Sequence, residues 1–343
     1  MCLLKREWAA EWELAYLAPA IQGAAERDLA RKDQFLRGVI YLTSRTEIDL
    51  AGIKLKNPII MASGTYGYGE EFKNFYDPKI LGGISSKGIT RHPKKGNEGI
   101  RIWETPSGIL NSIGLENPGV EEFVKEKIFS MQELGTEIFV NLGGNTIEEY
   151  VESTKILNDY DFAAIELNIS CPNVKEGGIA FGQDPKAVEA ITKEVKKYAK
   201  QPIIMKLSPN VTDITEMARA AEAGGADILS LINTLTGMKI DIYRKTFALA
   251  NKTGGMSGPA VKPVAVRMVY QVAQAVKLPI IGMGGIATAE DALEFIMAGA
   301  TAVSVGTANF FNPYATTEIV DGLAKFMEQQ KVEDINQLIG IVK

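Results

Sequence analysis

The chain has 343 residues, of which 46% are hydrophobic, and its 37 Lys and Arg against 42 Asp and Glu give a formal net charge of -5. This composition is typical of a globular protein and excludes collagen-like, low-complexity and disordered classes. Because Lys and Arg do not cluster into a basic block, a nucleic-acid partner is not expected.

Residues 1–45 differ in character from the rest of the chain. Large apolar side chains recur there at every fourth position, at Leu4, Trp8, Trp12 and Tyr16, before Pro19 interrupts the pattern. The spacing predicts an N-terminal extension that is largely helical. A helix that binds a partner or a membrane surface is the alternative, although a lipid-binding face is normally richer in Lys and Arg. No stretch approaches about 18 uninterrupted apolar residues, so a membrane-spanning helix is not expected.

Residues 46–57 alternate between apolar and polar side chains on either side of Ala51-Gly52. Such alternation around a turn dipeptide predicts a short hairpin. We expect this hairpin to precede the main fold, where it could cover the bottom of a barrel.

Eight short runs rich in Val and Ile follow, separated by segments of helical periodicity. The runs are 58–63, 82–89, 137–143, 163–170, 202–208, 228–234, 279–285 and 302–308. Near-continuous apolar runs are typical of parallel strands that are covered on both faces. The predicted helices include 119–134, 146–159, 184–200, 213–224, 262–277 and 288–299. Capping signals stand at Thr146 and at Asp184-Pro185.

The repeated unit of strand, loop and helix predicts an α/β fold, a (β/α)8 TIM barrel. An open doubly wound sheet usually has fewer strands and a glycine fingerprint after the first. Gly64, Gly67 and Gly69 lack the spacing of that fingerprint. We therefore expect one barrel domain over 46–343, after the extension of 1–45.

Polar residues or glycines stand where each apolar run ends, and in a barrel these positions form the active face. They are Ser63, Lys87, Asn141, Asn168 with Ser170 and Cys171, Lys206, Asn233 with Thr234, Gly284 with Gly285, and Gly306 with Thr307. Turn chemistry explains one or two such residues but not a ring that includes two lysines. The glycines after the last two runs predict a site for a phosphorylated ligand.

Cysteine and histidine are scarce, since the chain has only Cys2, Cys171 and His92. Two cysteines cannot form a disulfide framework or supply four ligands to an iron–sulfur cluster. With one histidine, neither a histidine-based metal site nor a Ser-His-Asp triad is expected. We expect a reducing, cytoplasmic compartment and no metal site. Cys171 is a candidate for acid/base or nucleophilic work, because a nearby lysine would favour its thiolate.

The positions alone do not name the reaction. A phosphate site with lysines after two of the strands also suits an aldolase that forms a Schiff base through Lys206 or Lys87. A non-catalytic barrel that only binds a ligand is a third interpretation.

Several motifs together resemble the dihydroorotate dehydrogenase family. They are ASGTYG at 62–67, SSKGIT at 85–90, NSIGLENPG at 111–119, NLGGN at 141–145, ELNISCPNVKEGG at 166–178, MKLSPNVTDI at 205–214, INTLTGMKID at 232–241, GGMSGPAVKP at 254–263, PIIGMGGI at 279–286 and VGTANF at 305–310. The resemblance covers roughly 46–343. Class 2 enzymes of the family have serine at the position of Cys171. The resemblance is therefore closer to one subgroup, the class 1B catalytic subunit.

The resemblance implies roles for named residues. It implies FMN contacts at Ser63, Ser86, Lys87, Asn141, Asn168, Lys206, Ile232, Gly258, Gly284, Gly285, Gly306 and Thr307. It implies contacts to dihydroorotate or orotate at Lys87, Asn111, Ser112, Ile113, Gly114, Leu115, Asn168, Asn233 and Thr234. Cys171 matches the base that removes the proton from C5 while a hydride passes from C6 to FMN.

The resemblance also implies a second subunit, which carries FAD and a [2Fe–2S] cluster and passes electrons to NAD. This chain has neither a dinucleotide fingerprint nor four cysteines, so direct reduction of NAD needs such a partner. Fumarate- and quinone-linked enzymes are the alternatives. The family's assembly is a homodimer core within a heterotetramer.

Overall fold

The computed structural model describes residues 45–169 and 181–342, which belong to one compact unit that spans residues 44–343. The predicted helical extension over 1–45 lies outside the described residues, apart from Arg45. Cys171 and Ser170 lie outside them as well.

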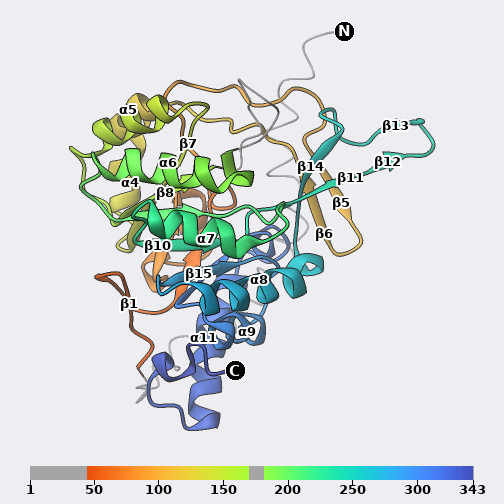
Figure 1. Cartoon of the computed structure of the whole chain (residues 1–343). Coiled ribbons are helices and arrows are strands. Elements are labelled where there is room, and N and C mark those ends of the chain that lie inside the picture. The colour runs from red at the N-terminus through yellow and green to blue at the C-terminus, as the bar shows by residue number, and fades with distance from the viewer. Residues whose placement is uncertain (1–44, 170–180, 343) are drawn as a thin grey trace. The chain divides into compact units, whose positions relative to one another are not determined.

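Eight parallel strands of the described chain close into a barrel (Figure 1). They are β3 (Ile59–Met61), β4 (Gly83–Ser85), β7 (Glu137–Gly143), β8 (Ala164–Asn168), β9 (Ile203–Lys206), β10 (Ile228–Leu231), β15 (Ile280–Met283) and β16 (Ala302–Val305). Each pairs with the next in chain order, and β16 closes the ring against β3 with Val303 beside Ile59. Each predicted apolar run thus contains one barrel strand, and the (β/α)8 architecture is confirmed.

Helices alternate with the strands, as the periodicity predicts. They are α5 (Ile147–Leu157), α6 (Pro185–Lys196), α7 (Ile214–Ala223), α8 (Lys262–Ala275), α9 (Ala289–Ala298), α10 (Ala308–Phe311) and α11 (Ala315–Gln330). The expected helix over 119–134 is built from α3 (Val120–Glu122), a wider π turn at Phe123–Lys127, and α4 (Ile128–Gln132). The predicted caps form: Thr146 Oγ1 accepts from the Glu149 amide, and Asp184 Oδ1 accepts from the Lys186 amide.

The barrel strands are buried on both faces. Ile203, Ile204 and Met205, three successive residues of β9, are each 0% exposed. Their burial explains why the strands are uninterrupted apolar runs rather than alternating patterns.

The predicted hairpin consists of β1 (Ile48–Leu50) and β2 (Ile53–Leu55), which pair antiparallel. Ala51 and Gly52 make its turn with φ of 54° and 88°. Leu50 and Leu55 are buried, and the Lys56 ammonium donates to the Lys79 carbonyl at 2.6 Å. Because Lys79 precedes β4, the hairpin lies at the amino-terminal end of the barrel strands, opposite the end where the site is expected.

A four-stranded antiparallel sheet was not expected from the sequence. Its order is β11 (Leu235–Met238), β14 (Thr253–Ser257), β6 (Gly108–Asn111) and β5 (Ile102–Thr105). The strands belong to insertions after β4 and β10, and a smaller hairpin of β12 (Ile240–Asp241) and β13 (Thr246–Phe247) extends away from the barrel (Figure 1). These strands are short, and β6, β11 and β14 contain glycines, so they show neither an apolar run nor a clear alternation.

Candidate active site

Three polar side chains are buried together inside the barrel. Asn141 on β7 is 0% exposed, Glu166 on β8 is 2% exposed, and Lys206 on β9 is 5% exposed. The parallel register places Asn141 beside Glu166. Asn141 and Lys206 were predicted as site residues, and the structure brings them together through Glu166.

The Glu166 carboxylate is the centre of this cluster. Its Oε2 accepts a hydrogen bond from Asn141 Nδ2 at 2.5 Å and lies 3.5 Å from Lys206 Nζ. Its Oε1 accepts from the Ser230 hydroxyl of β10 at 2.8 Å. Four neighbouring strands therefore meet at one carboxylate. Sequence reasoning gave Glu166 and Ser230 no role, although an acidic residue inside the apolar run 163–170 was the available signal.

Among the described residues, Asn141 has one buried side-chain atom without a hydrogen-bond partner. Its Oδ1 makes no hydrogen bond to the described residues, whereas its amide nitrogen is held by Glu166. A Cβ added at Gly88 would lie 3.0 Å from this Oδ1 and 3.2 Å from Leu115 Cδ2, so a side chain at position 88 would crowd the unpaired oxygen. A buried acceptor without a donor costs about 1–3 kcal/mol, and a ligand N–H there would remove that cost.

Ser86 and Lys87 continue from the end of β4. The Ser86 hydroxyl accepts a hydrogen bond from the backbone N–H of Asn141 at 3.0 Å and donates one to the Lys87 carbonyl at 3.1 Å. The Lys87 amide donates to the Gly67 carbonyl. At the end of β3, the Ala62 amide donates to the Val305 carbonyl of β16, and a Cβ at Gly306 would lie 3.4 Å from Ala62 Cβ, so Ser63 directly follows the residue beside Gly306.

Glycines bring three backbone segments together beside the end of β15. Gly285 has a φ of 80°, and a Cβ there would lie 2.8 Å from the Gly258 carbonyl and 2.9 Å from the Lys262 amide nitrogen. Thr307 Oγ1, at the end of β16, donates to Ser257 Oγ at 2.8 Å. Gly284 precedes Gly285 in the same turn. Loops after the seventh and eighth strands of such barrels commonly bind phosphate. This backbone cradle at the start of α8 suits such a group.

Amide side chains form a second group at the ends of β8 and β10. Asn233 Nδ2 donates to Asn168 Oδ1 at 3.0 Å, and the Thr234 amide donates to Asn233 Oδ1 at 2.8 Å. Asn111 lies opposite Gly255 in the antiparallel sheet, where a Cβ on Gly255 would lie 2.1 Å from Thr234 Oγ1. The predicted substrate residues on separate segments are therefore neighbours.

The segment of Ser112, Ile113, Gly114 and Leu115 lies over the ends of β4 and β7. Asn97 holds it, donating from its backbone to the Ile113 carbonyl and from its side chain to the Ser112 carbonyl, both at 2.9 Å. Leu115 reaches the barrel: a Cβ at Gly143 would lie 3.3 Å from Leu115 Cδ1.

Three further residues make hydrogen bonds at the barrel end. The amide of Ile232, predicted as an FMN contact, donates to the Met283 carbonyl and ties the end of β10 to β15. Asn210 and Tyr150 were not singled out by the sequence. Asn210 Nδ2 donates to the Thr234 carbonyl at 3.0 Å, and Tyr150 Oη donates to the Asn168 carbonyl at 2.7 Å.

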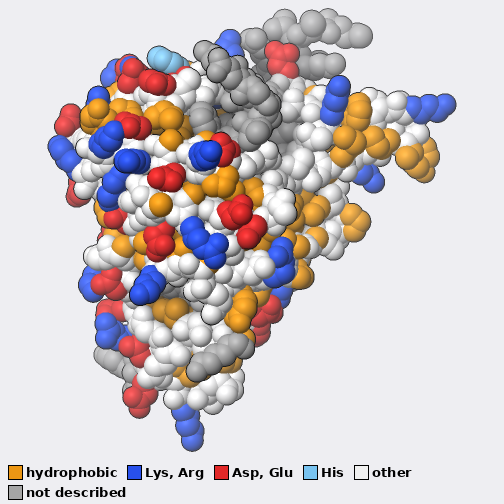
Figure 2. Space-filling model, viewed as in Figure 1, with side chains coloured by type: hydrophobic (Ala, Val, Ile, Leu, Met, Phe, Trp, Pro, Cys, Tyr) orange, Lys and Arg blue, Asp and Glu red, His pale blue; other side chains and the backbone are white. Residues whose placement is uncertain are grey.

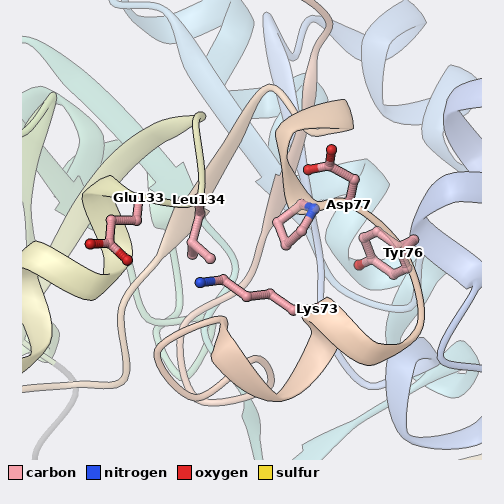
Figure 3. Close-up of a pocket in the computed structure, with 6 residues that line it drawn as sticks. Lys73, Tyr76, Asp77, Glu133 and Leu134 are labelled. Carbon is pink, nitrogen blue, oxygen red and sulfur yellow. The ribbon is translucent and has the colours of Figure 1, made fainter.

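Two cavities lie elsewhere and contain none of the predicted site residues. The first, about 250 Å³, lies on the flank of the barrel, where Lys73 extends toward Glu133 and Leu134 (Figure 3). Burial raises the pKa of Tyr76, on its wall, to about 12. The second, about 740 Å³, is lined by the β1–β2 hairpin at the opposite end from the site.

Within residues 45–169 and 181–342, no three His, Cys, Asp or Glu side chains gather so that they could hold a metal ion. No helix within them combines the length and the apolar character needed to cross a membrane.

Comparisons with known proteins place the chain among relatives of one kind. The model of the Dihydroorotate dehydrogenase family matches residues 45–327. A protein of Lachnoclostridium phytofermentans is 62% identical over 298 residues, which cover 87% of this chain and 99% of the relative. A protein of Alkaliphilus oremlandii is 57% identical over 293 residues, covering 85% and 97%. Both relatives are named dihydroorotate dehydrogenase B (NAD(+)), catalytic subunit.

Proposed function

This chain belongs to the dihydroorotate dehydrogenase family, and from that membership we propose that it is the FMN-binding catalytic subunit of an NAD-linked enzyme. It is an oxidoreductase of the family that oxidises dihydroorotate to orotate in pyrimidine biosynthesis. The observation that carries the proposal is the meeting of a glycine cradle, a buried cation and an amide cluster at one end of the barrel, in a chain 62% identical to a catalytic subunit of that name.

The residues at the barrel end fit FMN. Gly258, Gly284 and Gly285, with Thr307, would hold the phosphate with backbone close to it. Asn141 Oδ1 would accept from a ring N–H, and Lys206 would lie near the part of the ring that gains negative charge. The bound flavin supplies a hydride acceptor. Ser63, Ser86, Ile232 and Gly306 would complete its surroundings.

Dihydroorotate presents both imide and carboxylate groups, which need donors and acceptors together. Asn111, Asn168 and Asn233 supply both kinds, and Thr234 adds a hydroxyl. Lys87 would pair with the substrate carboxylate. The segment from Ser112 to Leu115 would cover the substrate from the side of β4 and β7 and exclude water.

Cys171 is the proposed base. It follows the end of β8, three residues after Asn168, and matches the base of the family. Its thiolate would take the proton from C5 of dihydroorotate while C6 gives up the hydride. An unperturbed thiol has a pKa of about 8.5, so the protein gains the competent form as pH rises.

The proposed partner is a second subunit that carries FAD and a [2Fe–2S] cluster and reduces NAD. The names of the relatives specify a catalytic subunit and NAD, and this chain's two cysteines are too few for a cluster. The protruding β12–β13 hairpin supports an assembly with further chains. Ile242 and Tyr243 at its tip are 70% and 91% exposed, and hydrophobic side chains gather there (Figure 2). We propose a homodimer core within a heterotetramer.

The choice of electron acceptor tests the proposal. The chain is purified alone and with the candidate partner, and dihydroorotate oxidation is compared with NAD, fumarate and a quinone as acceptors. We expect NAD to be reduced only by the two-subunit complex. Rapid reduction of fumarate or quinone, with no NAD reduction by the complex, would assign the chain to the alternative classes. A colourless protein that traps a carbonyl substrate on borohydride reduction would instead favour the aldolase that uses Lys206 or Lys87.

A further inference from the structure

We propose that Glu166 is a positioning residue that orients Asn141 and offsets the charge of Lys206, and that it thereby keeps the bound flavin a strong enough reductant to pass its electrons on. The inference rests on the proposed function, because it assumes that a flavin binds at the ends of these strands. It concerns a residue that contacts the cofactor's neighbours rather than the reacting atoms.

The surroundings of Glu166 are built around its charge. The carboxylate is 2% exposed, and its two oxygens meet side chains from three other strands: Asn141, Lys206 and Ser230. A buried carboxylate carries a desolvation cost that only pairing and hydrogen bonding offset. Asn141, Ser230 and the Lys206 ammonium supply those interactions on both oxygens.

Glu166 determines which end of the Asn141 amide faces the ligand. A carboxylate only accepts hydrogen bonds, so the side of Asn141 that faces Glu166 is its NH₂ group. The other end, Oδ1, is thereby turned away from Glu166, close to Gly88 and Leu115, and no described residue donates a hydrogen bond to it. A neutral glutamine at position 166 would remove this constraint, since its amide can donate as well as accept.

Glu166 also balances the charge of Lys206. The two side chains are 2% and 6% exposed and 3.5 Å apart, so solvent screens them little. A reduced flavin carries more negative charge than an oxidised one, and a lone cation beside it would stabilise the reduced form. A cation that is paired with a carboxylate stabilises the reduced flavin less. The pair therefore lets Lys206 bind the cofactor without making its reduction so favourable that electrons stay on the flavin.

The Glu166→Gln variant tests this inference directly. With flavin bound, its midpoint potential is measured by equilibration with a reference dye. We expect the potential to move to more positive values, with reduction of the flavin by dihydroorotate retained and electron transfer onward to NAD slowed. A flavin potential equal to that of the wild type would overturn the inference. The matched control is Ser304→Ala, a buried barrel serine that makes no hydrogen bond to the described residues, which should leave the potential unchanged.

If the single variant folds poorly or loses flavin, a double-mutant cycle tests the pairing of Glu166 with Lys206 instead. The thermal midpoints of flavin-free Glu166→Gln, Lys206→Met and the double variant are compared. Each single variant leaves one buried group without its partner, so we expect the double variant to be more stable than the sum of the single losses allows. Purely additive losses would contradict the pairing. Neither measurement requires turnover, so a wild-type protein that binds flavin but does not oxidise dihydroorotate would contradict the proposed function alone.

Discussion

At the scale of single residues, Cys171 carries the proposed chemistry. Replacing it with alanine removes the base but no proposed flavin contact, so Cys171→Ala should bind flavin and remain yellow while turnover falls to background. Turnover of the wild type should rise as the pH approaches about 8.5, the pKa of an unperturbed thiol. Steady-state rates and the visible spectrum of the same preparations check both points. Cys2→Ala, the other cysteine of the chain, is the control and should keep full activity. A wild-type rate in Cys171→Ala would remove Cys171 from the mechanism.

The strand-end residues could be predicted from the sequence because each apolar run contains one barrel strand. Asn168 and Lys206 end their strands and Asn141 lies two residues before the end of β7, so the barrel brings all three toward one face. Glu166 could not be predicted in its role. Its partners lie 25, 40 and 64 residues away, and only the register of β7 to β10 makes them neighbours.

At the scale of the element, the start of α9 shows how the glycine cradle is supported. Thr288 and Asp291 form a reciprocal capping box, and Lys262 at the start of α8 donates to Asp291 Oδ1 at 2.6 Å. Burial of Asp291 raises the pKa of its carboxyl, but the Lys262 hydrogen bond and the amides of Ala287 and Thr288 outweigh it, so the pKa is lowered overall. The carboxylate thus ties α9 to α8 beside Gly285.

The Asp291→Asn variant should therefore be less stable near neutral pH, by about 1–2 kcal/mol, since it weakens charge-assisted hydrogen bonds. A carboxyl whose pKa is lowered by folding stabilises the protein above its unfolded pKa and loses that contribution as pH falls through the folded value. The difference from wild type should therefore shrink below about pH 4. Denaturant unfolding at several pH values measures this difference in the free energy of unfolding. The control, Glu290→Gln, changes an exposed charge of the same turn. A difference independent of pH would contradict this account of Asp291.

The barrel elements and their caps were predictable, whereas the antiparallel sheet was not. A barrel strand buried on both faces leaves an apolar run in the sequence, and Thr146 and Asp184 mark helix starts by hydrogen bonds to local amides. Strand β14 contains two adjacent glycines, Gly254 and Gly255. They are needed because Asn111 and Thr234 approach the strand closely, and not because glycine favours strands. Such long-range requirements leave no local periodicity.

At the scale of the whole molecule, the β12–β13 hairpin offers a test of assembly. Its tip carries Ile242 and Tyr243, the latter 91% exposed, at a distance from the barrel core. Substituting both with serine should leave the fold and the flavin intact, because these side chains are largely solvent-exposed. If the hairpin joins two copies, sedimentation should show a dimer for the wild type and a monomer for the double variant. A dimer in both proteins would move the interface elsewhere. Lys239→Gln, on the same arm, is a control that keeps the apolar tip.

In the proposed function, this chain alone oxidises dihydroorotate on its own flavin. The most direct measurement mixes the purified chain with dihydroorotate in the absence of oxygen and of any acceptor, and follows the visible absorbance of the flavin together with the orotate formed. We expect the flavin band to bleach, with one orotate released for each flavin reduced. A bound flavin whose spectrum dihydroorotate leaves unchanged, with no orotate formed, would contradict the account.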